Sequence, residues 1–276
     1  MGTSSLYKGP KKTVLLPSDY EPVDNFNQSP VDNTPDEIIP DCDDAENGTP
    51  SQESSSSPDV SWSTARSSVR KAMNNRSVVN VKRAISNYTK ALGGHTNAMR
   101  QAAKVRKTAN VLYTLFAGSP EVIRRRLEEV GISFEGRPTK DIFNDICISI
   151  APIPNDFEDA LVNKSLYETF SDIAADQSID LNQLDNFNED LLQRLVGGLI
   201  KHYIFNKLIF QSEQTALKNC EHVNDLQDLE KSIKQYIDGI VDSVVPDLVK
   251  SGINPSDFNR VLETLCDICY QQMEDL

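Results

Sequence analysis

The chain has 276 residues, a net charge of -13, a mean hydropathy of -0.42 and only 38% hydrophobic residues. These values are low for a chain that folds throughout, so we expect part of it to stay unfolded. No apolar run approaches the roughly 20 residues of a membrane span, no secretory signal opens the sequence, and the five scattered cysteines fit reduced thiols. We therefore expect a cytoplasmic protein with no membrane partner.

The charge is distributed very unevenly along the chain. Residues 1–60 carry a net charge of -9, residues 61–120 hold eleven Lys and Arg and no acidic residue, and residues 121–276 carry a net charge of -15. The composition predicts a recognition and acceptor motif at 1–17, a disordered acidic linker rich in proline and serine at 18–63, a basic helical segment at 64–118 and an acidic helical body at 119–276. The linker has too few apolar side chains to offset the roughly 1–2 kcal/mol of backbone entropy that each ordered residue loses.

From about residue 64 the apolar residues recur every three or four positions, which predicts helices. The first is expected over 64–92, where a Gly-Gly pair ends it, and the second over 96–116. Ser119 and Pro120 are an N-cap followed by proline at the first helical position, and they predict a third helix that ends at Gly131.

The next two elements are expected over 139–150 and from Asn155 onward. The first has one apolar face at helical spacing, but the alternation of Ile146, Ile148 and Ile150 also fits a strand. In the second, Asn155 is expected to cap a helix whose apolar residues, beginning with Phe157, face inward.

Three further helices are predicted to complete the body. Residues 188–210 are the most hydrophobic stretch and are expected at its centre. Residues 226–248 have nearly heptad spacing, with a kink at Pro246, and the last helix starts at Asn254 and Pro255. The predicted fold class is therefore all-α, a multi-helix, bundle-like body preceded by a long disordered N-terminal tail.

One cysteine pair has the spacing of metal ligands. Cys266 and Cys269 form a C-x-x-C pair, and Cys220 with His222 would complete a set of four zinc ligands. The pair nevertheless lies on the apolar stripe of the last predicted helix, where cysteine behaves as a small hydrophobic residue. We interpret it as core and predict no metal site.

No pattern in the sequence indicates catalysis. His95 and His202 have no neighbouring Ser or Cys arranged as a nucleophile with its base, and phosphate-cradling glycine motifs do not occur. Gly197 and Gly198 fall inside a helix, where close packing is the ordinary reason for glycine. We predict a non-enzymatic protein without catalytic residues or cofactors.

The basic segment has two interpretations. Its cations could neutralise phosphates of a nucleic acid through a salt-sensitive attraction that ignores sequence, or they could dock on an acidic protein surface, either a partner's or that of the chain itself. Aromatic residues for base stacking are scarce there beyond Tyr88, which favours the second. The candidate contact residues are Arg66, Arg70, Lys71, Arg76, Lys82, Arg83, Lys90, Arg100, Lys104, Arg106 and Lys107.

The N-terminus offers a different chemistry. The small side chain of Gly2 favours removal of Met1, which leaves a free glycine amine, while Leu6 breaks the myristoylation pattern. An α-amine has a pKa of about 7.7–8.0, so much more of it is neutral and nucleophilic near neutral pH than of any lysine. Gly2 is therefore a candidate acceptor for a group that another enzyme activates.

The opening MGTSSLYKGPKKTVLLPSDY, the acidic proline-rich tail, the basic segment and the later GRPTKDIFNDI together resemble the QatB family, a component of the bacterial Qat antiphage defence system. The resemblance covers the order of segments over the whole chain, and its sharpest part is the opening motif. It implies three partners encoded beside the protein: an ATPase, a QueC-like enzyme and a TatD-like nuclease.

QueC-type enzymes adenylate the carboxylate of a 7-deazaguanine, and an amine can capture such an activated carboxylate. The resemblance therefore implies an amide between a deazaguanine and Gly2, with recognition by Thr3, Ser4, Tyr7, Gly9 and Pro10. The expected function is a non-enzymatic adaptor that is modified at its N-terminal glycine. The alternative is a nucleic-acid-binding subunit that delivers phage nucleic acid to the nuclease partner through the basic segment.

Overall fold

A computed structural model describes residues 60–276 apart from 76, 135, 152, 177–178, 184–185, 220–222 and 251, and it gives the backbone alone at 212–219 and 223–225. The described residues belong to one compact unit, Ser54–Leu276. The predicted acceptor motif and nearly all of the predicted linker lie outside them.

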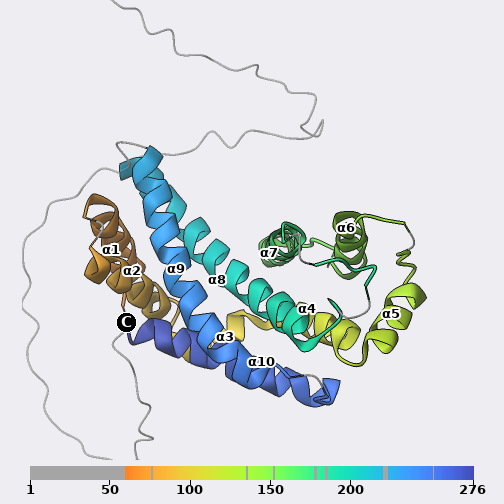
Figure 1. The fold of residues 1–276 in the computed structure, drawn as a ribbon. Coiled ribbons are helices and arrows are strands. Elements are labelled where there is room, and N and C mark those ends of the chain that lie inside the picture. The colour runs from red at the N-terminus through yellow and green to blue at the C-terminus, as the bar shows by residue number, and fades with distance from the viewer. Residues whose placement is uncertain are drawn as a thin grey trace, which may run out of the picture. The chain divides into compact units, whose positions relative to one another are not determined.

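Every regular element in the described part of the chain is a helix, as Figure 1 shows, which confirms the predicted all-α body. The bounds of the helices are α1 Trp62–Asn74, α2 Val78–Ala91, α3 Gly94–Gln101, α4 Ala103–Phe116, α5 Pro120–Glu129, α6 Thr139–Ile150, α7 Phe157–Ala174, α8 Glu189–Asn219, α9 Val223–Leu248 and α10 Pro255–Glu274.

The long helix α8 lies at the centre of the packing. It contacts α7 and α9 most extensively and also α4 and α1, while α10 contacts α3, α4, α9 and α2. Leu192, Leu195, Leu199 and Tyr203 are buried on α8, with Val196, Ile200 and Ile204 beside them. The prediction that this stretch is buried at the centre of the body is therefore confirmed.

The expected single helix over 64–92 is wrong, because two helices occupy this stretch. Asn75 has an extended conformation (φ -139°, ψ 98°), and the hydroxyl of Ser77 accepts the N–H of Asn80 as the cap of α2. The apolar spacing continues across the break because α1 and α2 pack against each other and share one core. Apolar spacing alone does not reveal where the chain reverses, because both helices bury their apolar faces in the same core.

The expected helix over 96–116 is also divided, at Ala102 (φ -77°, ψ 14°). Its first part, α3, packs on α10, and its second part, α4, packs on both α10 and α8. Gly93 and Gly94, with φ of +90° and +78°, make the preceding turn in a conformation that side chains with a Cβ rarely adopt. The division lets each part follow its own packing partner.

Two details of α6 and α7 also differ from expectation. Residues 139–150 form a helix, so the strand alternative is wrong, and Ile148 lies on its exposed side. Asp156, rather than Asn155, caps α7 by accepting the N–H of Asp159 at 3.0 Å. Phe157 consequently points outward and is 42% exposed, so its predicted inward orientation is wrong.

The remaining helix ends follow the local sequence. Pro120 opens α5, and Asn254 caps α10 while Pro255 takes its first position. Helix α9 continues through Pro246 for its last turn and ends at Leu248. In none of the described helices is there a stretch both long and apolar enough to cross a membrane.

Candidate functional site

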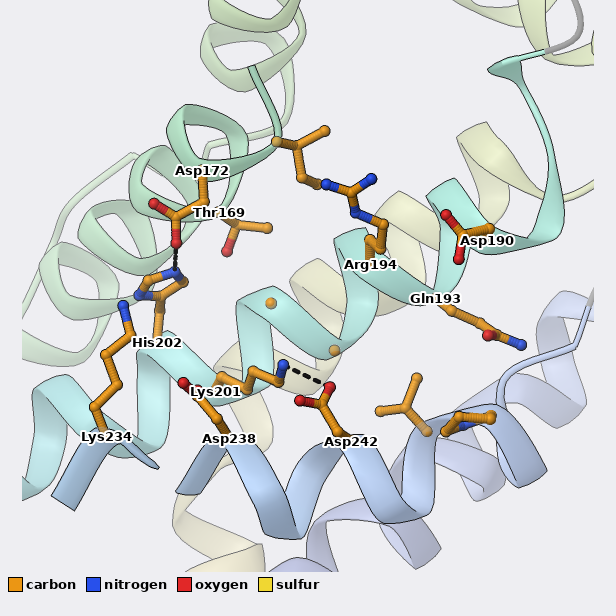
Figure 2. A pocket seen from close by; sticks show the side chains of 15 residues that line it. Thr169, Asp172, Asp190, Gln193, Arg194, Lys201, His202, Lys234, Asp238 and Asp242 are labelled. Carbon is orange, nitrogen blue, oxygen red and sulfur yellow. Dashed lines mark hydrogen bonds and ion pairs between the residues drawn. The ribbon is translucent and has the colours of Figure 1, made fainter. Parts of the chain in front are cut away.

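A polar groove of about 410 Å³ lies between α7, α8 and α9, and Figure 2 shows the side chains that line it. Its floor is α8, where Gly197 and Gly198 allow both neighbouring helices to approach closely. A Cβ on Gly198 would lie 2.7 Å from Cγ2 of Thr169 on α7, and one on Gly197 would lie 3.3 Å from Val245 on α9. Close packing, as predicted, accounts for this glycine pair.

His202 is buried at one end of the groove between two carboxylates of α7. Its Nε2 lies 3.0 Å from Oδ2 of Asp172, and its Nδ1 lies 3.4 Å from Oε2 of Glu168. Lys164 Nζ donates to Glu168 at 2.5 Å, and the amide of Asn206 donates to it at 2.6 Å. Burial opposes ionisation of Glu168, but the hydrogen bonds from His202, Lys164 and Asn206 outweigh it and lower the pKa of Glu168 to about 2.

The other wall of the groove is acidic and comes from α9. Lys201 of α8 reaches across and pairs with Asp242 at 2.6 Å, as the dashed line in Figure 2 marks. Burial raises the pKa of Asp238, although the positive charges of Lys201 and Lys234 act in the opposite direction. In Figure 2 the amine of Lys234 extends from α9 toward His202.

At the other end of the groove Arg194 pairs with Asp176 at 2.9 Å, and the amide of Gln193 donates to the carbonyl of Val249 at 2.9 Å. The ion pairs of Arg194, Lys201 and His202 therefore join α8 to another helix or to the loop beside it, whereas Lys164 and Glu168 both belong to α7. Both ring nitrogens of His202 face carboxylates, so they join α7 to α8. This arrangement suits a structural polar contact better than a base that awaits a substrate.

The described candidate residues that were predicted from the sequence do not line this groove. The acceptor Gly2 and the recognition residues Thr3, Ser4, Tyr7, Gly9 and Pro10 lie outside the described residues, as does Arg76. Arg66, Arg70, Lys71, Arg83, Arg100 and Lys107 are exposed on α1 to α4.

Four other cations of the basic segment contact the chain itself. Lys104 Nζ lies 2.5 Å from Asp156 and 2.7 Å from Asp159, and Arg106 lies 2.6 Å from Glu263 of α10. Lys82 lies over the ring of Tyr236, with its Nζ 5.7 Å from the centroid, and Lys90 donates to the hydroxyl of Ser86. Lys104 and Arg106 thus pair with carboxylates of the acidic body. These two contacts agree with the interpretation that cations of the basic segment dock on an acidic protein surface, here that of the chain itself.

The cysteines of the C-x-x-C pair lie in the core. Cys266 and Cys269 are buried on α10, and burial raises the pKa of both thiols, that of Cys269 to about 12. Their predicted core position is confirmed. Cys220 and His222 lie outside the described residues, and within the described ranges no three His, Cys, Asp or Glu side chains form a group that could hold a metal ion.

Sequence reasoning missed two features that only packing creates. The ion pairs of His202 join residues about thirty positions apart, and no motif links them. The second feature is a group of exposed aromatic rings, Trp62, Phe157 and Phe210, which come from α1, α7 and α8. The outward position of Phe157 could not be read from apolar spacing, because that spacing places it on the inner face.

The comparisons with known proteins yield one family. A family model described as "Qat anti-phage system associated protein QatB" matches residues 93–273. This range begins at the Gly93-Gly94 turn and reaches almost to the end of α10, so it includes the whole groove. No curated protein and no solved structure matches the chain.

Proposed function

Because the chain belongs to the QatB family and is thereby a component of the Qat anti-phage system, we propose that it is a non-enzymatic adaptor subunit that is modified at its N-terminal glycine. The match confirms the resemblance seen in the sequence. The observation that carries the modification part of the proposal is the start of the chain, Met1-Gly2-Thr3-Ser4, which would present a glycine amine once methionine is removed.

The proposed chemistry uses a QueC-like partner, whose presence the family resemblance implies. In that enzyme the carboxylate of a 7-deazaguanine would attack the α-phosphorus of ATP, which forms the acyl adenylate and releases pyrophosphate. The neutral amine of Gly2 attacks the acyl carbon, the bond from that carbon to the AMP oxygen breaks, and AMP leaves as the new amide loses a proton. The lower pKa of an α-amine favours it over lysine amines. We assign the reaction to the bacterial cytoplasm, where ATP is available.

Recognition of the acceptor would use Thr3, Ser4, Tyr7, Gly9 and Pro10. Glycine has no Cβ, so its amine can enter a narrow active site. The helical body would then dock the ATPase and the TatD-like nuclease of the same system. The ion pairs across the groove support this role, because they fix α7, α8 and α9 as a rigid surface.

The test compares intact masses of the protein made with and without its neighbouring genes. Wild type is expected to gain a defined mass on the N-terminal peptide when the genes are present. Gly2→Pro should abolish both the mass gain and phage defence while the helical circular dichroism signal is unchanged. A matched control, Lys8→Arg with Lys11→Arg and Lys12→Arg, removes the nearest lysine amines and should keep the gain. Full defence by Gly2→Pro would show that Gly2 is not the acceptor.

A further inference from the structure

Besides the groove, the body has a second hollow, beside the start of α1. Its residues are far in the sequence from the predicted acceptor Gly2. Trp62 and Arg66 of α1 and Phe210 and Gln211 of α8 line a hollow of about 260 Å³. Trp62 is 37% exposed and Phe210 is 51% exposed. Such large aromatic rings are normally buried, and several of them together at a surface indicate a binding site.

Two of the exposed rings contact each other, and the third packs against a buried ring. The ring of Phe157 lies 4.2 Å from that of Phe210, with an angle of 34° between their planes, and Trp62 packs edge-on against buried Tyr88 at 6.0 Å. The rings of Trp62 and Phe210 are therefore supported from beneath or from the side. They form a platform whose open faces can take a flat group without a large loss of side-chain entropy.

Gln211, which lines the hollow, carries an unsatisfied hydrogen-bond acceptor. Oε1 of Gln211 is buried and has no hydrogen-bond partner among the described residues. A buried amide oxygen without a donor costs about 1–3 kcal/mol, so native proteins normally satisfy such an atom. Because the oxygen itself is covered, a ligand in the hollow can donate an N–H to it once the Gln211 side chain rotates toward the hollow.

The charge beside the hollow favours an anion. Arg66 lines it, and Arg70 follows at the i+4 spacing that places both arginines and Trp62 along one side of α1. Both arginines are exposed. Near Phe157, Lys104 is shared by Asp156 and Asp159, at 2.5 Å and 2.7 Å, and Lys207 pairs with Glu158. Arg66 and Arg70 thus place positive charge beside the hollow, although the body as a whole is acidic.

We propose that this hollow binds one unpaired base of a single-stranded nucleic acid. The base stacks on Phe210 and Trp62, the Gln211 side chain rotates so that its amide oxygen accepts an N–H of the base, and the flanking phosphates pair with Arg66 and Arg70. Aromatic rings beside a positive track are how proteins hold single strands without reading their sequence. The volume lies below the roughly 300–1,000 Å³ of a site for a complete small-molecule ligand, which fits a single base that the strand on either side helps to hold.

The proposal is independent of the modification of Gly2, and the protein carries its own probe. Trp62 is the sole tryptophan, so its fluorescence reports on this hollow alone. The full chain is titrated with single-stranded dA and dT 12-mers and with the duplex that they form. Both single strands should quench the fluorescence to saturation, whereas the duplex, whose bases are paired, should not.

Variants separate stacking from charge. Phe210→Ala should weaken binding by on the order of tenfold, because stacking on one ring is lost. Arg66→Gln should weaken it and reduce the salt slope by about 0.7, since one phosphate contact disappears. The matched controls are Tyr167→Ala, an exposed ring on α7 at a different pocket, and Arg125→Gln, an exposed arginine on α5, and both should bind like wild type.

Three results would overturn the proposal. These are no quenching by either single strand at 50 mM salt, equal quenching by the duplex, or unchanged affinity in Phe210→Ala. Quenching by a partner protein of the defence system, with none by the oligonucleotides, would instead identify the hollow as a protein interface. Gly2→Pro should leave every one of these titrations unchanged, so a failure of the acceptor proposal would not affect this one.

Discussion

Lys207 on α8 lies inside the core and is only 2% exposed. Its ammonium group has two partners, one on α7 and one on α8. Its Nζ lies 2.8 Å from Oε1 of Glu158 and donates to the hydroxyl of Tyr203 at 3.1 Å. Burial raises the pKa of Tyr203, so the hydroxyl stays protonated and donates to Glu158 at 2.8 Å. A buried charge is tolerated here because each polar atom in the group has a partner.

Glu168 provides a prediction about pH at the same scale. Its pKa is lowered to about 2 in the folded protein, against about 4.3 in an unfolded chain. A lowered pKa means that its contribution to the free energy of unfolding is complete above pH 4.3 and is lost as the pH falls toward 2. Glu168→Gln should therefore destabilise the protein by about 1–2 kcal/mol at pH 7, less than for a fully buried carboxylate because Glu168 is partly exposed.

Urea unfolding at pH 7 and at pH 3 measures this difference, which should shrink at the lower pH. Glu129→Gln is the control, because Glu129 is well exposed and its ion pair with Arg125 is long, at 3.7 Å. Its effect should be small at both pH values. A Glu168→Gln deficit that does not change between pH 7 and pH 3 would mean that the carboxylate charge is not what stabilises the α7–α8 contact.

At the scale of elements, the close approach of α7 and α9 to α8 depends on Gly197 and Gly198. The groove lies along the same three helices, with the ion pair of Arg194 at one end and those of His202 at the other. Helix α9 also holds a glycine, Gly239, whose added Cβ would meet nothing within 4 Å. Substitution by alanine should therefore change the free energy of unfolding in opposite directions at Gly198 and at Gly239.

Gly198→Ala is predicted to destabilise the protein by about 1–2 kcal/mol, because its Cβ would overlap Thr169 and overpacking outweighs the better helix propensity of alanine. Gly239→Ala should stabilise it by about 0.5–1 kcal/mol, since the propensity gain meets no clash. Chemical denaturation of both variants measures the difference. Stabilisation by Gly198→Ala would show that α7 and α8 are not in close contact at this point.

At the scale of the whole molecule, hydrogen bonds of Glu274 on α10 join this last helix to α2 and α3. The carboxylate of Glu274 on α10 accepts the N–H of His95 at 2.8 Å, and the hydroxyl of Ser86 on α2 donates to the Glu274 carbonyl at 2.6 Å. His95 Nδ1 also lies 2.8 Å from Asp267. The basic helices α2 and α3 are thereby attached to the last acidic helix, almost two hundred residues later in the chain.

Glu274→Ala is predicted to lower the free energy of unfolding by about 1–3 kcal/mol, because the N–H of His95 at the start of α3 loses its acceptor. For a unit of this size each kcal/mol lowers Tm by roughly 2–4 °C. Differential scanning calorimetry measures the shift. Asp275→Ala, a change at the next, exposed residue, is the control and should leave Tm nearly unchanged, and an equal shift in both variants would contradict the role given to Glu274.

The sequence by itself determined the fold class, the family and most helix ends. Pro120 and Asn254 mark helix starts through capping and backbone restrictions that act within a few residues, and the central position of α8 follows from its wide apolar face. The core position of Cys266 and Cys269 follows from the same apolar spacing. These properties are local, so a linear pattern contains them.

Only the tertiary structure decided where the chain reverses and which distant side chains meet. The break between α1 and α2 and the bend at Ala102 leave the apolar spacing intact, because both arms bury one stripe in one core. The groove of His202 and the aromatic hollow of Trp62 combine residues from helices far apart in sequence. These contacts form only when the helices pack against one another. Local sequence preferences do not specify which helix faces come together.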